Sequence, residues 1–205
     1  AKIEYDIIIP TANKSFTGLM TSAGGFTTHD TTTDEWGWAS LTCGNIKNTD
    51  FKDLGNGFSK VHVSTPLTEE VKGACKLDIQ IDAYQCTYKG DMYVDNVKIS
   101  APETSAEETS KSTVIYSNDL EGEKAPDEVG GIITSSDVSV ADLGEDNKAL
   151  KIASKFDGTD SWENNIHQIG FNTNYTKDLS KDAKIEYDII IPTANKSFTG
   201  QMKGA

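Results

Sequence analysis

The chain has few cysteines and few basic residues. Three cysteines in 205 residues are too few for a disulfide scaffold, and their odd number leaves at least one thiol free. Nineteen lysine and arginine residues stand against 32 aspartate and glutamate residues, which gives a formal net charge of −13. Nucleic acids and anionic membranes are bound through basic patches, so this balance argues against both as partners. A secreted, extracellular protein kept soluble by its charge is the simplest interpretation.

Long apolar runs and common catalytic motifs are also missing. No apolar run reaches the ~18 residues that a membrane helix needs. No signal peptide is present, but the chain begins inside a predicted strand, so we expect its natural amino terminus to lie upstream. There is no Gly-x-Ser-x-Gly elbow and no phosphate-binding loop, and the three histidines lack metal-ligand spacing.

An eighteen-residue segment occurs twice without change. Residues 1–18 and 183–200 both read AKIEYDIIIPTANKSFTG, at an offset of 182 residues. The part IEYDIIIP is rich in β-branched residues and ends at a proline, which predicts a strand. Since one domain needs an inner strand only once, we interpret the chain as the end of one module joined to the start of the next. The alternative is an engineered circular permutant in which this segment was duplicated.

Strand patterns fill both halves of the chain. The clearest is residues 76–84, where apolar and polar side chains alternate and predict one core face and one polar face. Residues 101–113 have no aliphatic side chain larger than alanine and predict a linker between residues 1–100 and 114–205. The predicted strands cover residues 2–9, 19–24, 36–44, 58–64, 75–84, 92–99, 114–116, 149–153 and 165–171, together with the second copy of the repeat.

The two halves make one domain when they are joined in the other order. Residues 113–200 followed by 19–100 give 170 residues of β pattern in which none is used twice. We therefore predict an all-β fold, a jelly-roll β-sandwich of two antiparallel sheets. In it, residues 1–100 are the carboxy-terminal half and residues 114–205 the amino-terminal half of a module. The halves close within one chain, or they pair with a neighbouring module or a strand-exchanged copy.

Several motifs follow one another along the chain when the two halves are read in the rejoined order. They are KALKI at 148–152, DSWE at 160–163, IEYDIIIP at 185–192, GW at 37–38, FSKVHV at 58–63 and YKGDMYVDNV at 88–97. With these motifs the chain resembles the family 27 carbohydrate-binding modules of secreted bacterial mannanases, and the related family 23 modules. The resemblance implies a jelly-roll sandwich that binds β-1,4-mannan, glucomannan or galactomannan without catalysis. It also implies a parent glycoside hydrolase that the module directs to plant polysaccharide.

Members of that family stack sugar rings on exposed tryptophans, because the indole face is flat and electron-rich. Trp162 and Trp38 match the family's platforms. Trp36 joins them because residues two apart share one side of a strand; a core position for one or two of the three is the alternative. Motif adjacency and strand alternation predict polar contacts to sugar hydroxyls, with a solvated strand face as the plainer interpretation. These residues are Glu163, Asn165, His167, Gln80, Asp82 and Tyr84, with Lys203 in the strand after the second copy.

The resemblance also implies a structural Ca²⁺ ion between the first and last strands. Asp119, Glu121 and Asp95 supply the hard oxygen ligands that calcium prefers. Such an ion would tie the chain ends together and take no part in chemistry. Ordinary surface carboxylates are the alternative.

Two other classes of function compete with binding. A glycosidase needs two carboxylates at a fixed separation. The pairs Asp34–Glu35 and Glu69–Glu70 lie in loop-like stretches without buried surroundings, so we expect no enzyme. A calcium-stabilised spacer or adhesion module would explain the repeat and the linker but leaves the tryptophans unexplained. We therefore expect a non-catalytic binder.

Overall fold

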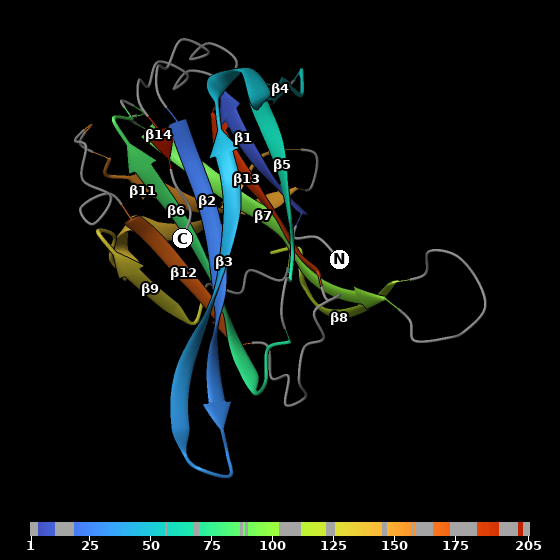
Figure 1. Cartoon of the computed structure of the whole chain (residues 1–205). Coiled ribbons are helices and arrows are strands. Elements are labelled where there is room, and N and C mark those ends of the chain that lie inside the picture. The colour runs from blue at the N-terminus through green and yellow to red at the C-terminus, as the bar shows by residue number, and fades with distance from the viewer. Residues whose placement is uncertain are drawn as a thin grey trace.

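The structure, a computed structural model, is nearly all β and has two layers of strands (Figure 1). The prediction of an all-β sandwich is confirmed. Among the parts of the chain that the structure describes, no helix is long and apolar enough to cross a membrane. The described residues are 4–10, 19–55, 57–67, 70–86, 88, 90–102, 112–121, 126–144, 147–156, 158, 166–172, 184–192 and 201–202.

One layer is a six-stranded sheet in the order β14-β3-β2-β6-β12-β9. Its neighbouring strands are antiparallel, and an additional pairing of β14 with β2 is parallel. The hairpin of β2 and β3 extends past the end of the sandwich (Figure 1). The bounds are β2 (Leu19–Asp30), β3 (Glu35–Ile46), β6 (Ala74–Tyr84), β9 (Glu128–Gly131), β12 (Ile166–Asn172) and β14 (Gln201–Met202).

The other layer is an eight-stranded sheet in the order β10-β11-β7-β1-β13-β5-β4, with β8 paired to β7. It contains both copies of the repeated strand, as β1 and β13. Short 3₁₀ turns, η2 (Asn48–Asp50) and η3 (Ser135–Asp137), complete the described elements. The bounds are β1 (Glu4–Pro10), β4 (Lys52–Asp53), β5 (Phe58–Pro66), β7 (Gly90–Pro102), β8 (Ser112–Asn118), β10 (Val138–Asp142), β11 (Lys148–Ser154) and β13 (Lys184–Pro192).

One main hydrophobic core lies between the two layers. Leu77, Ile79 and Ile81 of β6 are fully buried in it, and Val94 and Ile152 face them from the eight-stranded sheet. Truncating a buried side chain of this kind to alanine costs about 2–5 kcal/mol. The alternation predicted for residues 76–84 is therefore confirmed, and it turns the polar side chains of β6 away from the core.

All six strands predicted in the first hundred residues are present; five have longer bounds than predicted, and the first is described from Glu4 to Pro10. β2 continues to Asp30, six residues past its predicted end. Gly24 and Gly25 lie inside this strand as regular paired residues, and Gly25 pairs with Ser40 and Asp78. The two- to five-residue strands β4, β9 and β10 were not predicted.

The expected linker at 101–113 begins and ends in paired strands. β7 ends at Pro102, β8 begins at Ser112, and these two residues pair with each other. The hairpin of β7 and β8 therefore holds the two ends of the linker side by side within the eight-stranded sheet.

Candidate functional site

The polar face of the six-stranded sheet gathers side chains from five strands. Residues directly opposite one another on paired strands point to the same side of a sheet. The register pairs Trp38 with Thr27, Thr27 with Lys76, and Lys76 with Asn172. We call this side the outer face. It carries Trp36, Trp38, His29, Thr27, Lys76, Asp78, Gln80, Gln168, Asn172 and Glu128.

Trp36 is the most exposed large apolar side chain among those described, at 66%. Its ring stacks on His29, with 4.1 Å between the centroids and 9° between the planes. Nε2 of His29 lies 2.8 Å from Oδ1 of Asp34 at the hairpin turn. Asp34 therefore holds His29, and the ring of His29 in turn supports one face of the Trp36 indole.

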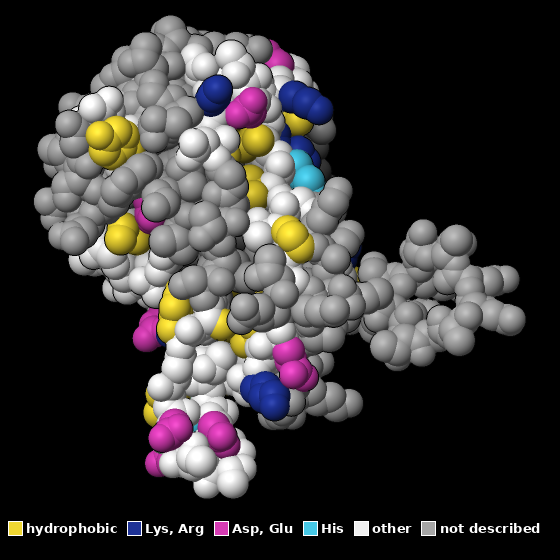
Figure 2. Space-filling view, viewed as in Figure 1, with side chains coloured by type: hydrophobic (Ala, Val, Ile, Leu, Met, Phe, Trp, Pro, Cys, Tyr) yellow, Lys and Arg dark blue, Asp and Glu magenta, His cyan; other side chains and the backbone are white. Residues whose placement is uncertain are grey.

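The hairpin turn has its own polar structure. Oδ1 of Asp30 accepts a hydrogen bond of 2.8 Å from the backbone N–H of Thr32. This bond, with a second one from Thr33, lowers the pKa of Asp30. Asp30, Asp34 and Glu35 are exposed, and acidic side chains gather at the tip of the hairpin (Figure 2).

Trp38 is 44% exposed and lies over a glycine of the neighbouring strand. A Cβ atom on Gly25 would be 2.2 Å from Cζ2 of Trp38 and 2.8 Å from the backbone oxygen of Ala39. Any side chain at this position would displace the indole or the strand behind it. Gly25 therefore leaves the space that the indole occupies against the sheet.

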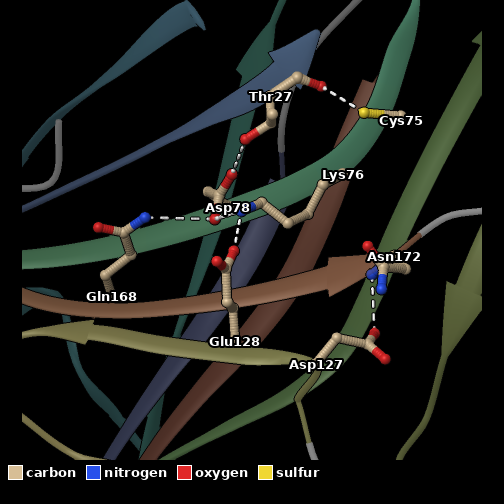
Figure 3. Close-up of polar contacts among 8 residues, drawn as sticks. All are labelled: Thr27, Cys75, Lys76, Asp78, Asp127, Glu128, Gln168 and Asn172. Atoms are coloured by element: carbon tan, nitrogen blue, oxygen red, sulfur yellow. Dashed lines mark hydrogen bonds and ion pairs between the residues drawn. The ribbon is translucent and has the colours of Figure 1, made fainter. Parts of the chain in front are cut away.

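Asp78 is at the centre of a hydrogen-bond network on the outer face (Figure 3). Its Oδ2 accepts a bond of 3.0 Å from the hydroxyl of Thr27, and its Oδ1 accepts one of 3.3 Å from Nε2 of Gln168. Nζ of Lys76 lies 3.7 Å from the same Oδ1. Because Asp78 is fully buried, desolvation raises its pKa, and these three partners oppose that rise.

The network continues to the strands at the edge of the sheet. Lys76 also forms an ion pair with Glu128 of β9, and Oδ2 of Asp127 accepts a 2.8 Å bond from the backbone N–H of Asn172 (Figure 3). A Cβ atom on Gly170 would lie 2.8 Å from Oδ1 of Asp78, so this glycine makes room for the carboxylate. The outer face thus combines positioned donors and acceptors with two supported indoles.

Five of the ten sequence-predicted ligand contacts lie on the outer face. Trp36 and Trp38 are exposed there, Gln80 and Tyr84 are partly exposed, and Asp82 is buried. The other predicted contacts apart from His167 fall outside the described residues. They are Trp162, Glu163, Asn165 and Lys203.

His167 does not lie on the outer face, because its side chain points into the sandwich. It is 1% exposed, stacks on Phe156 with 4.0 Å between centroids, and accepts a bond of 3.2 Å at Nε2 from the backbone N–H of Lys155. Burial lowers its pKa to about 3. Gln168, the next residue, is opposite Gln80 and takes the place expected of His167. Strand alternation contained this signal, since β12 also turns Ile169 inward.

The residues predicted to bind calcium are only partly brought together. Glu121 lies close enough to Asp95 to raise its pKa, whereas Asp119 is exposed and its Oδ1 accepts a 3.2 Å bond from the backbone N–H of Glu121. No three histidine, cysteine or acidic side chains in the described part of the chain form a group that could hold a metal ion. The calcium site therefore stays a prediction.

Asp95 instead adjoins a second buried aspartate. Nδ2 of Asn96 donates to Oδ2 of Asp95, at 3.1 Å, and also to Asp188 of β13. The pKa of Asp95 is raised to about 7, mainly by burial and also by the carboxylates of Asp188 and Glu121, while the backbone N–H of Asn96 opposes this rise.

The residues considered for hydrolysis lie on the surface where the structure describes them. Asp34 and Glu35 are exposed at the hairpin, Glu70 is exposed, and Glu69 falls outside the described residues. Cys75 and Cys86 are not in disulfide bonds, and Sγ of Cys75 donates a 3.4 Å bond to the backbone oxygen of Thr27. Comparison of the chain with protein-family models, curated proteins and solved structures finds no match. The function therefore has to be argued from the outer face itself.

Proposed function

We propose that the chain is a non-catalytic carbohydrate-binding module that holds a mannan, glucomannan or galactomannan chain on the outer face. The observation that carries this proposal is the pair of exposed indoles on one side of β3, Trp36 at 66% and Trp38 at 44%. Adjacent exposed aromatic side chains on a polar face are typical of binding sites. Sugar rings fit them because their C–H faces are apolar and pack against an electron-rich surface.

Both indoles are held in place by the fold. His29 stacks on Trp36, and Gly25 lets Trp38 lie against β2. Rigid ligand platforms lose little conformational entropy on binding, which favours affinity. Same-side residues along a strand are about 6.6 Å apart, so the two rings form a strip that suits consecutive pyranose rings of an extended chain.

Polar side chains continue from this strip across the sheet. Thr27 separates Trp38 from Lys76, and Lys76 reaches Glu128 at the far edge. Gln80 and Gln168 lie opposite each other on β6 and β12, four residues along each strand from the pair Lys76–Asn172. Sugar hydroxyls both donate and accept hydrogen bonds, so ammonium, amide and carboxylate groups in one surface complement them.

A module of this kind would act outside the cell, attached to a glycoside hydrolase that degrades plant polysaccharide. Its acidic surface, with a net charge of −13, agrees with a neutral polysaccharide ligand rather than with nucleic acid or membrane. The module would raise the local concentration of its parent enzyme on the substrate.

Calorimetry with mannohexaose and cellohexaose tests the proposal. The wild-type chain is expected to bind mannohexaose, and the double variant Trp36→Ala/Trp38→Ala to lose at least about 100-fold in affinity, since each indole is a hot spot. Leu54→Ala is the matched control, because Leu54 is an exposed apolar side chain (46%) beside the other sheet. Undiminished binding by the double variant would contradict the proposal, as would release of reducing sugar from mannan.

A further inference from the structure

The eight-stranded sheet has one strand position that both copies of the repeat occupy. β1 and β13 each pair with β5 in antiparallel orientation, and residues 182 apart have the same partner. The same holds on the side of β7. The shared pairings are Tyr5 and Tyr187 with Val63, Ile9 and Ile191 with Ser59, Pro10 and Pro192 with Phe58, and Ile8 and Ile190 with Tyr93.

This shared position cannot satisfy both copies at once. A strand has two edges, yet each copy pairs with three strands, namely β5, β7 and the other copy. Each residue has one backbone N–H and one C=O to give to a ladder. The edges of β5 and β7 therefore complete their hydrogen bonds with one copy at a time.

The duplication continues into the six-stranded sheet. Met20 of β2 and Met202 of β14 both pair with Ile46 of β3, and they also pair with each other in parallel. Each copy and the first residues that follow it thus compete for the same strand positions in both sheets.

The charges around the shared position agree with this. The buried carboxylate of Asp188 lies 3.6 Å from Nζ of Lys60 and 3.7 Å from Nδ1 of His62. In the first copy, Asp6 pairs with His62 in the ladder of β1 and β5. Each copy therefore brings one aspartate to the same position beside β5.

We propose that the chain folds in two alternative frames. In the first frame β1 fills the shared position and the second copy is released, whereas in the second frame β13 fills it and the first copy is released. The two copies have identical sequences, so they make the same contacts in that position. The frame thus decides which end of the chain presents an unpaired β-strand, while Trp36 and Trp38 stay the same in both.

The frames differ mainly in their connections. Residues 11–18 join β1 to β2, and residues 173–183 join β12 to β13. Loop closure favours the shorter connection by only about 1.6-fold. At the start of β2, Leu19 pairs with Tyr84, and the second copy has Gln201 beside Leu19. With such small differences, both frames are expected to be populated.

Proline substitutions in the full chain test this proposal. Ile7 and Ile189 are equivalent strand residues that pair with each other. Proline removes a ladder donor and is excluded from inner strands, so Ile7→Pro disables the first copy and Ile189→Pro disables the second. Each single variant is expected to lower the folding equilibrium constant by about twofold, because one of two frames remains. The double variant is expected to lower it at least about 100-fold.

Denaturant unfolding gives these values, with Ile7→Val and Ile189→Val as controls for the loss of side-chain packing. A single proline that is as damaging as the double would show that one copy alone fills the position and would overturn the proposal. If both single variants were strongly destabilised and their effects added in the double variant, both copies would be needed at once. This outcome would also overturn the proposal. A mild double variant would show that neither copy fills it.

Amide exchange read by mass spectrometry is the second measurement. Peptides that extend into Leu19–Met20 or Gln201–Met202 distinguish the two copies, which are otherwise identical. Ile7→Pro should protect the second copy and expose the first, and Ile189→Pro should do the reverse. Wild-type chains should show partial protection of both. Full protection of the same copy in every chain would overturn the proposal.

Discussion

The two sheets each bury an aspartate outside the main core, and the two aspartates have opposite surroundings. Asp78 on β6 accepts bonds from Thr27 and Gln168 and lies near Lys76. Asp95 on β7 is buried beside another carboxylate, which helps to raise its pKa to about 7. Burial alone therefore does not reveal what a carboxylate does; its partners do. The first organises a face that presents donors and acceptors, and the second marks the position that the repeated strands share.

The largest expected effect is on the six-stranded sheet. Gly25→Ala places a Cβ atom 2.2 Å from the ring of Trp38 and 2.8 Å from the backbone of β3, so the indole must move. We expect a loss of about 3 kcal/mol in the free energy of unfolding, together with at least tenfold weaker mannohexaose binding. Urea denaturation and calorimetry measure the two effects.

Gly130→Ala is the matched control for that change. Its Cβ atom would meet the side chain of Gln168 at 3.6 Å, an ordinary contact on the same face. Equal damage by both substitutions would mean that the space under Trp38 has no special importance.

The second effect concerns Asp78. Asp78→Asn keeps the shape but replaces a carboxylate oxygen, which accepts a hydrogen bond from Thr27 or Gln168, with an NH2 group that donates. A buried donor left without its acceptor costs about 1–3 kcal/mol. We expect unfolding at pH 7 to become easier by about 2 kcal/mol. An unchanged free energy in urea denaturation would show that the network is not a stabilising one.

Asp95→Asn should have the opposite sign. At pH 8 the Asp95 carboxylate is ionised in a buried place beside Asp188, and the neutral amide removes that repulsion. We expect a gain of about 1–2 kcal/mol at pH 8 that disappears at pH 4, where the carboxyl is protonated in the folded protein. A loss of stability in Asp95→Asn at pH 8 would show that the two buried aspartates do not differ in their effect on the fold.

The pH dependence of stability sharpens this contrast further. The folded pKa of Asp95 is raised from 3.8 to about 7, so its contribution is complete below pH 3.8 and is lost as the pH rises through 7. The folded pKa of His167 is lowered from 6.5 to about 3, so its contribution is present above pH 6.5 and is lost as the pH falls towards 3. The two slopes oppose each other between pH 4 and 6.5, and the wild type should be nearly flat there.

Single variants separate these slopes in thermal or urea unfolding. Asp95→Asn should leave a stability that rises with pH by about 1 kcal/mol per unit, and His167→Gln one that falls by a similar amount. Asp188, Glu121 and Lys60 surround the first group, and Asp137 and Lys155 the second, so these stay unchanged in both variants. If stability changed with pH in the same direction in both variants, the opposing contributions assigned to Asp95 and His167 would be refuted.

The smallest effect is at the hairpin. His29→Ala removes the ring under Trp36 but leaves the indole itself, so affinity for mannohexaose should fall by about threefold. Stability should change by less than about 0.5 kcal/mol, since the hairpin extends beyond the core. Thr31→Ala in the same turn serves as the control.

Much of the architecture follows from local pattern. Alternation in residues 76–84 predicted which side of β6 faces the core, and it put Gln80, Asp82 and Tyr84 on the outer face. The Trp-Gly-Trp spacing likewise predicted that both indoles share one side of a strand. Local pattern is sufficient here because side-chain direction has a period of two in any strand.

The rest of the outer face depends on register between distant strands. Asp78 and Gln168 are 90 residues apart, and the sequence around neither residue predicts their hydrogen bond. The need for a glycine at position 25 arises only because Trp38 of the next strand lies over it. His167 was misplaced for a different reason, since motif adjacency was weighted above the alternation of β12.

The hairpin of β7 and β8 has a practical consequence. Strands from before and after it alternate within both sheets, with β7 beside β11 and β6 beside β12. A chain cut between Pro102 and Ser112 would therefore remain a single particle, because backbone ladders in both sheets and a common core hold its pieces together. Produced as separate polypeptides, the pieces would form a complementation pair, and the Asp78–Gln168 bond would exist only after they had reassembled.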